Sequence, residues 1–235
     1  MIIAKESPLR RIPHGWDRKE TLFYDAIRCS IEMTDMGYFN LHNRLLELTS
    51  KHDQDKGAKI ENIGQIILAA MLNAWSVIDS TYRLRGLLEQ IPRIKHNSPP
   101  LILFRQKTQN VETPRHIIQH LNTEINNIVI KNLTVLGVLS WVAWLKQEEK
   151  WCYTCSIAAG SLFERTDPFI NPAGKSIRPP IDLITLDAGY PLNLSSMMVE
   201  ISKVTHWLEE ELKKHFGTLP QAGADVFYSA EYHWS

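Results

Sequence analysis

The side chains best suited to acid–base and anion chemistry lie close together, within residues 113–122. They are Arg115, His116, Gln119, His120 and Asn122. Imidazole is the side chain that most readily exchanges a proton near neutral pH, and a guanidinium group binds phosphate through two parallel hydrogen bonds. These residue types therefore predict a site that acts on a phosphate-containing molecule.

The same segment is predicted to begin a helix that ends near Asn132. Thr113 is a suitable cap, and Pro114 suits the first helical position. Arg115 and His116 then lie in the first turn, where the helix dipole disfavours each charged cation by about 0.3–1 kcal/mol. A bound anion would remove this cost, and free backbone N–H groups would help Arg115 to hold a phosphate. The placement favours an anion-binding role.

A long helix is predicted just before this segment, over residues 60–91, because apolar residues recur there at intervals of three and four. Asp79 and Arg83 lie one turn apart on this helix and can form an ordinary ion pair. The stretch that follows is basic, with seven basic and two acidic residues from Arg83 to Arg115. From residue 181 to the end there are three lysines and eight acidic residues, so a neutral chain is locally polarised.

At these residues the chain resembles the HEPN family, helical nucleotide-binding domains that include many prokaryotic ribonuclease toxins and also catalytically silent members. The family's mark is an Arg followed after four to six residues by His, near the start of a helix that packs on a long preceding helix with a polar or acidic residue. Arg115-x4-His120 fits this spacing, and Asp79 is the candidate acidic partner. Position 116 is His where many members have Asn. The similarity covers residues 60–132, and the last helix would complete the bundle.

The resemblance implies metal-independent RNA cleavage, in which the 2′-hydroxyl attacks the adjacent phosphorus. His120 would act as general acid or base, Arg115 would stabilise charge on the phosphoryl oxygens, and Asp79 would orient one of these two. The expected substrate-binding residues are His116, Arg83, Gln119 and Asn122. The expected partners are RNA, a second copy of the chain that places two motifs at a homodimer seam, and a cognate inhibitor protein. No metal or cofactor is expected.

Other helices are predicted from apolar spacing and from the residues that interrupt it. The first covers residues 17–48, with a break at Gly37, and a polar connector follows at 51–59. Residues 92–113 contain three prolines and are predicted to form a loop with one apolar anchor. The last helix covers residues 195–216.

A small sheet is predicted between the third and the last helix. Alternating apolar residues on both sides of residues 146–150 predict a hairpin, and the apolar runs 181–186 and 190–194 predict two more strands. Residues 166–180 hold four prolines and are predicted to cross the surface.

These elements predict an α+β fold with a single domain over residues 1–235. Its helical core, HEPN-like by the resemblance, would comprise residues 17–132 and 195–216. A small antiparallel β-sheet would be inserted before the last helix, within residues 133–194.

The composition excludes a disordered, a collagen-like and a low-complexity chain. The chain has 235 residues, 44% of them hydrophobic, and a formal net charge of zero. A chain of this composition buries a core and has no overall field that would attract nucleic acid or acidic membranes. The start of the sequence lacks the pattern of a secretory signal, and the apolar run 133–145 is too short to cross a bilayer. We therefore expect a cytoplasmic protein without a membrane partner.

Two metal readings compete with the ribonuclease interpretation. His116 and His120 share a helix face, with Asp79 as a third possible ligand, but the chain has no H-E-x-x-H pattern. Cys152 and Cys155 have the C-x-x-C spacing of a redox site or of half a zinc site, yet they are predicted to lie on a strand, where residues three apart point to opposite faces.

A non-catalytic reading also stays open. Arg115 would then pair with Glu112 or Asp79, His120 would be satisfied at a helix interface, and the chain would be a structural or protein-interaction module. The aromatic residues of the predicted hairpin would form the sheet core, or a partner surface if they are exposed. They are Trp141, Trp144, Trp151 and Tyr153.

Overall fold

The computed structural model describes residues 2–13, 15–55, 62–131, 133–146, 151–160, 171–174, 183–216 and 227–232. The α-helices of these residues are α1 (Arg18–Asp55), α2 (Ile63–Glu89), α3 (Pro99–Thr108), α4 (Glu112–Gln119), α5 (Leu121–Ile130) and α6 (Leu194–Phe216). The strands are β1 (Val138–Lys146), β2 (Trp151–Ala158), β3 (Ile184–Asp187) and β4 (Pro191–Asn193), and two short 3-10 helices are η1 (Pro8–Arg10) and η2 (Gln109–Val111). The predicted α+β class is confirmed: the fold is mostly helical, with a small antiparallel sheet before the last helix.

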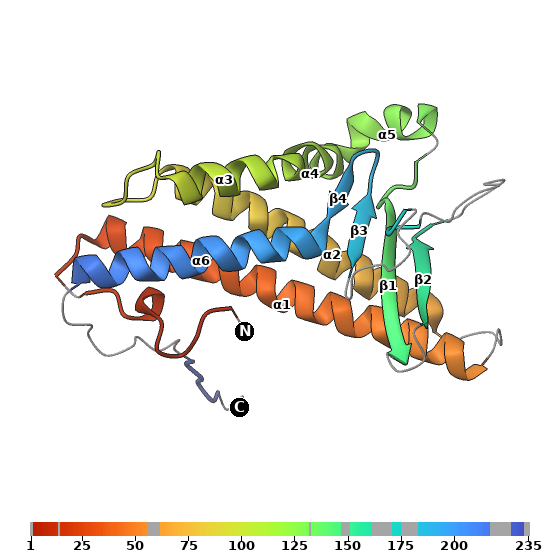
Figure 1. The fold of residues 1–235 in the computed structure, drawn as a ribbon, viewed down its shortest axis with the longest axis horizontal. Helices are drawn as coiled ribbons and strands as arrows, with labels where there is room; N and C mark the ends of the chain where they lie inside the picture. The colour runs from red at the N-terminus through yellow and green to blue at the C-terminus, as the bar shows by residue number, and fades with distance from the viewer. Residues whose placement is uncertain are drawn as a thin grey trace.

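The helices α1 and α2 run antiparallel and form the long axis of the molecule, and α6 lies between α1 and α3 (Figure 1). One face of α2 is buried at the centre of the core, through residues such as Met71, Ala74, Ile78 and Leu84. By length and apolar composition α2 alone among the described helices would also suffice to cross a membrane. A buried core helix meets the same criteria.

The sheet lies at the end of the molecule where α1 finishes (Figure 1). Its strand order is β2-β1-β3-β4, and every neighbouring pair is antiparallel. Trp141 of β1 is buried and donates a hydrogen bond from Nε1 to Thr49 Oγ1 of α1 at 2.9 Å. This contact fixes the middle of the sheet against the helices, and it places Trp141 in the core as the hairpin pattern predicts.

The first helix is longer than predicted and does not break at Gly37. A Cβ atom at Gly37 would lie 3.3 Å from the side chain of Val77 and 3.4 Å from the carbonyl oxygen of Asn73, both on α2. Gly37 is therefore a point of close approach between α1 and α2. The helix also continues to Asp55 through residues predicted as a connector, and Tyr153 of β2 donates its hydroxyl to Asp53 there at 2.5 Å.

The predicted loop over residues 92–113 is also wrong, because it contains α3 and η2. Pro99 and Pro100 occupy the first turn of α3, where a helix has no use for the missing N–H groups. Leu101, Phe104 and Thr108 follow at helical spacing and are buried. The prolines thus begin a helix rather than prevent one.

The third predicted helix is two helices, α4 and α5, which meet at His120. His120 has φ −111° and ψ 32°, outside the helical region. Thr113 does not cap α4, because α4 continues from η2 and the backbone N–H of Glu112 already donates to the carbonyl oxygen of Gln109. Sequence analysis placed the helix start at Thr113, whereas α4 begins at Glu112 directly after η2, and no side chain caps it.

Two segments lie largely outside the described part of the chain. The surface excursion over 166–180 is described only at 171–174, and the tail is described only at 227–232, where it is irregular. Its aromatic residues Phe227, Tyr228 and Tyr232 are exposed.

Arg85 fastens the α3–α4 segment to α2. Its side chain is 8% exposed, and its guanidinium donates to the carbonyl of Arg105, to Thr108 Oγ1 at 2.9 Å and to Glu112 Oε1 at 2.6 Å. We predict that Arg85→Met lowers the free energy of unfolding by about 2–3 kcal/mol, because charged hydrogen bonds are lost and the buried hydroxyl oxygen of Thr108 loses its donor. Urea denaturation measures this change.

Arg105 provides the matched control for that experiment. Its Nη2 donates to the carbonyl of His96 at 2.9 Å, in an exposed hydrogen bond. Arg105→Met should therefore cost less than about 1 kcal/mol. Equal losses for the two variants would show that Arg85 does not fasten the segment.

Candidate functional site

Asp79 of α2 lies at the centre of the predicted site and binds two arginines. Its Oδ1 accepts a hydrogen bond from Arg115 Nε at 2.8 Å, and its Oδ2 pairs with Arg83 Nη2 at 2.6 Å. The exposed fractions are 29% for Asp79, 21% for Arg115 and 56% for Arg83. One carboxylate therefore serves two guanidinium groups, so the cluster carries an excess of one positive charge at the molecular surface.

Arg115 has a second contact, with the aromatic ring of Tyr82. The guanidinium carbon lies 4.0 Å from the ring centroid. The carboxylate thus engages Nε and the ring engages one face of the guanidinium. Among the described residues, the two Nη groups of Arg115 have no hydrogen-bond partner. These groups are available to bind an anion.

The side chains of His116 and His120 lie beside each other and are exposed. Their ring centroids are 4.5 Å apart, and the ring planes make an angle of 47°. The backbone holds His120 in place, because its N–H donates to the carbonyl of His116 at 3.0 Å and its own carbonyl accepts from Thr123 and Glu124. The junction between α4 and α5 therefore presents two imidazoles to solvent next to Arg115 in sequence.

The structure brings the predicted site residues together in two groups. Asp79, Arg83 and Arg115 form the first, and His116 and His120 form the second. Gln119 and Asn122 are exposed and flank His120 in sequence. The sequence prediction that Asp79 is the acidic partner of Arg115 agrees with this geometry.

The structure also bears on the non-catalytic reading and on the metal reading of the histidines. Arg115 pairs with Asp79 and not with Glu112, which pairs with Arg85, so this half of the non-catalytic reading agrees with the structure. The other half is wrong, because His120 is exposed. For the metal reading, no group of three or more His, Cys, Asp or Glu side chains suited to hold a metal occurs among the described residues.

The cysteines on β2 occupy a strand, as predicted. Cys152 and Cys155 are half-buried, and burial raises the pKa of both thiols. A raised pKa reduces the thiolate fraction, which is the reactive form. This environment gives no support to redox or metal chemistry at the C-x-x-C sequence.

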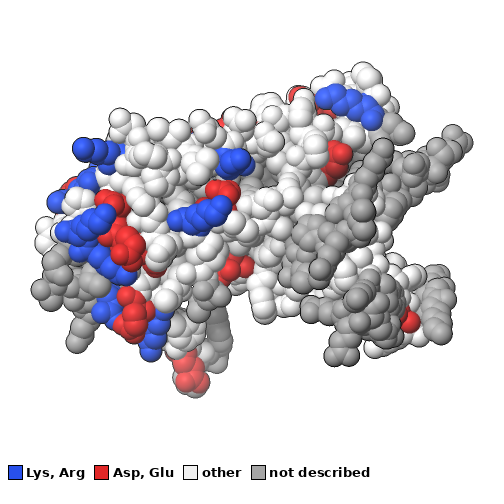
Figure 2. Space-filling view, in the orientation of Figure 1, with Lys and Arg blue, Asp and Glu red and all other residues white. Residues whose placement is uncertain are grey.

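Several basic side chains of the stretch from Arg83 to Arg115 pair with acids that are distant in sequence. Arg93 pairs with Glu20 at 2.7 Å, and Arg85 pairs with Glu112. Figure 2 shows Lys and Arg side chains interspersed with Asp and Glu where α6 ends, where Lys213 and Lys214 pair with glutamates one turn earlier. The Asp79 cluster keeps its excess positive charge, and so do Lys95, Arg105 and Lys107, which have no acid partner among the described residues.

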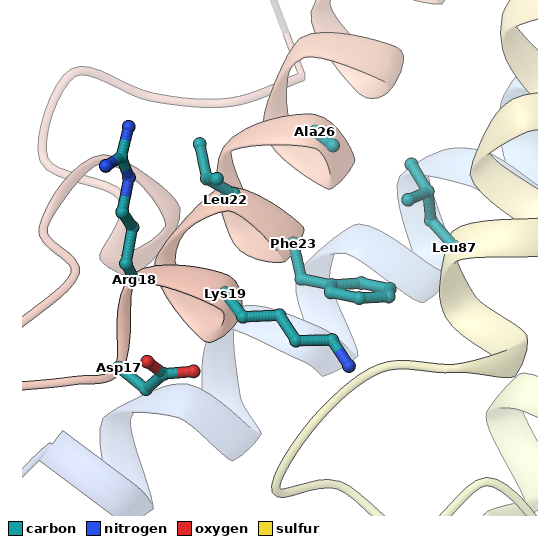
Figure 3. A pocket seen from close by; sticks show the side chains of 7 residues that line it. All are labelled: Asp17, Arg18, Lys19, Leu22, Phe23, Ala26 and Leu87. Atoms are coloured by element: carbon teal, nitrogen blue, oxygen red, sulfur yellow. The ribbon is translucent and has the colours of Figure 1, made fainter.

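Three hollows on the described surface lie away from the predicted site residues. One of about 600 Å³ lies between the start of α1 and the end of α2, where Phe23 points toward Leu87 (Figure 3). A groove of about 650 Å³ follows α1 past Met33 and Met36, and a third hollow of about 370 Å³ lies between η2 and the start of α6. None of the predicted site residues lines these hollows.

Tyr82 is a site residue that sequence analysis missed. It follows Asp79 by three positions on a predicted helix, which places both side chains on one face. That spacing was the available signal, but an aromatic residue at helical spacing is ordinarily a core residue. Tyr82 is instead 36% exposed.

Comparisons with protein-family models, with curated proteins and with solved structures found no match to this chain. The function is therefore argued from the geometry of the site.

Proposed function

We propose that the chain is a metal-independent endoribonuclease whose site comprises Arg115, His120 and Asp79. The observation that carries the proposal is the state of Arg115. Its Nε is held by Asp79 while both Nη groups have no hydrogen-bond partner among the described residues, and the exposed imidazoles of His116 and His120 follow on α4 and at its junction with α5. We further propose that the helices form a HEPN-like core.

The chemistry needs one anion-binding group and groups that move two protons. A base takes the proton of the 2′-hydroxyl while O2′ bonds to phosphorus, and the P–O5′ bond breaks as an acid protonates O5′. The products are a 2′,3′-cyclic phosphate and a 5′-hydroxyl. Arg115 would stabilise charge on the non-bridging oxygens, and His120 would transfer one of the two protons. His116, whose ring lies beside that of His120, would bind the same phosphate.

An open, polar surface suits single-stranded RNA as the substrate. The flanking residues proposed to bind it are exposed: Arg83, His116, Gln119 and Asn122. Phosphate contacts from such residues fix the position of a strand without reading its sequence. We therefore propose weak sequence preference.

A homodimer is part of the proposal. Apolar side chains are unusually exposed on two helices near the motif, with Leu72 of α2 and Val129 of α5 both 71% exposed and Ile130 of α5 80% exposed. Large exposed apolar residues favour burial against another protein surface. A second copy of the chain would cover these residues. A cognate inhibitor protein would either displace the second copy from them or cover the site beside them.

The test is incubation of the purified protein with single-stranded RNA in excess EDTA. We predict cleavage that leaves 2′,3′-cyclic phosphate and 5′-hydroxyl ends, because the attacking group is the 2′-oxygen. An oligonucleotide of the same sequence with 2′-deoxy sugars should stay intact. Cleavage only after a divalent metal is added, or cleavage of the deoxy oligonucleotide, would contradict the proposed chemistry.

The second candidate is a non-catalytic protein-interaction module. The exposed apolar residues of α2 and α5 favour it, because they suit a partner surface whether or not the site is active. Under this reading Asp79 and Arg115 only join α2 to α4. Absence of any RNA cleavage by a stable, folded protein would favour this candidate.

A further inference from the structure

Tyr82 touches Arg115, whose two terminal nitrogens have no hydrogen-bond partner among the described residues. Its ring centroid lies 4.0 Å from the guanidinium carbon of Arg115, and the residue is 36% exposed. We propose that Tyr82 is a positioning residue for RNA cleavage, which fixes the plane of the Arg115 guanidinium so that both Nη groups face the substrate phosphate. This role rests on the proposed ribonuclease function.

The pairing at Asp79 explains why a second contact is needed. A carboxylate usually binds arginine through two parallel hydrogen bonds, and these fix the guanidinium plane. Here Oδ2 of Asp79 is taken by Arg83 at 2.6 Å, so Asp79 holds Arg115 only through Nε. A single hydrogen bond leaves the guanidinium free to rotate about it. The ring of Tyr82 removes that freedom without using any N–H group.

Arg93 shows the alternative arrangement within the same molecule. Its guanidinium carbon lies 4.4 Å from the ring of Trp16, much as Arg115 lies over Tyr82. Glu20, however, accepts from both Nε and Nη2 of Arg93, at 3.0 and 2.7 Å. The donors on that side of Arg93 are therefore occupied. Each arginine contacts one acid and one ring, and they differ at Nη2, which binds the acid in Arg93 and is left open for a ligand in Arg115.

The ring of Tyr82 carries the proposed role, and its hydroxyl does not. Within the described part of the chain the Tyr82 hydroxyl has no hydrogen-bond partner. Phenylalanine at this position keeps the aromatic face, whereas leucine keeps apolar bulk and removes it. A cation–π contact contributes about 0.5–2 kcal/mol, which corresponds to a change of about 2- to 30-fold.

The experiment compares the wild type with Tyr82→Phe and Tyr82→Leu in cleavage of a single-stranded RNA. Tyr82→Phe should retain kcat within about twofold, and Tyr82→Leu should lower kcat about tenfold with a smaller change in KM. Tyr190→Leu is the matched control, because Tyr190 lies under Lys131 at 5.3 Å in a similar contact elsewhere. It should leave kcat unchanged. Thermal unfolding of each variant verifies that it is folded.

A second readout needs no RNA cleavage. It is the NMR chemical shift of the Hε proton of Arg115. In the wild type and in Tyr82→Phe the ring current should move this resonance upfield, and Tyr82→Leu should abolish that displacement. Unchanged kcat in a folded Tyr82→Leu variant of an active protein would overturn the role of Tyr82 alone, as would an equal loss in Tyr82→Phe. If the displacement is present but the wild type cleaves no RNA, the ribonuclease proposal itself fails, and with it the role of Tyr82 in cleavage.

Discussion

Replacing His120 by alanine should slow RNA cleavage by about 100- to 10 000-fold while the protein stays folded. This is the range by which a positioned acid or base accelerates proton transfer. The fold should tolerate the change, because His120 is exposed and its structural hydrogen bonds are made by its backbone, which alanine retains. The loss should appear in kcat with little change in KM, since the imidazole acts in the transition state.

His206 offers the matched control for this variant. It is an exposed histidine on α6, and His206→Ala removes the same side chain away from the Asp79 cluster. We expect its rate to remain within about twofold of the wild type. A rate for His120→Ala that equals that of His206→Ala would remove His120 from the mechanism.

Substitution of Arg115 should have the second large effect. Arg115→Ala should lower kcat by about 100- to 1000-fold, the usual loss when a donor to developing negative charge is removed. Arg115→Lys should recover only a small part of this loss. Lysine keeps the charge, but it has no Nε–H for Asp79 and no planar fork for the phosphate.

Arg93→Ala tests whether the loss of kcat requires removal of an arginine whose Nη groups are free to bind the substrate. Arg93 also combines a glutamate with an aromatic ring, and its donors on the carboxylate side are occupied. Its removal should leave the cleavage rate unchanged. A full rate for Arg115→Lys would show that charge alone is sufficient, which would contradict the proposed two-point binding of phosphate.

The longest elements of the fold were predictable from sequence because burial controls their pattern. Apolar residues at helical spacing predicted α2 and α6, and alternation around residues 146–150 predicted the hairpin of β1 and β2. In each case one face packs against the core, and the sequence records that face directly.

The errors in the fold share a physical cause, which is that the deciding contact is distant in sequence. Gly37 was expected to break a helix, but its missing side chain makes room for Val77 on α2. Asp53 was assigned to a polar connector, but the hydroxyl of Tyr153 binds its carboxylate on the last turn of α1. Single-sequence patterns do not contain such partners.

The acid that pairs with Arg115 could be anticipated from the sequence, whereas the ring of Tyr82 and the helix break at His120 could not. Sequence analysis named Asp79, on the family resemblance, and Glu112 as the acids that Arg115 could pair with, and the structure shows the pair with Asp79. Tyr82 and the break at His120 were not predictable. The first depends on the approach of α4 to α2, and the second depends on where two helices meet.

The central claim is that Arg115 and His120 act in one RNA-cleaving centre, and a double-variant comparison tests it most directly. The cleavage rates of the wild type, Arg115→Ala, His120→Ala and the double variant are measured on one single-stranded RNA in EDTA. Residues that act as a unit show strongly non-additive losses. The account predicts that the double variant is at most a few-fold slower than the slower single variant. Losses that multiply in the double variant, or a wild type no faster than the double variant, would contradict it.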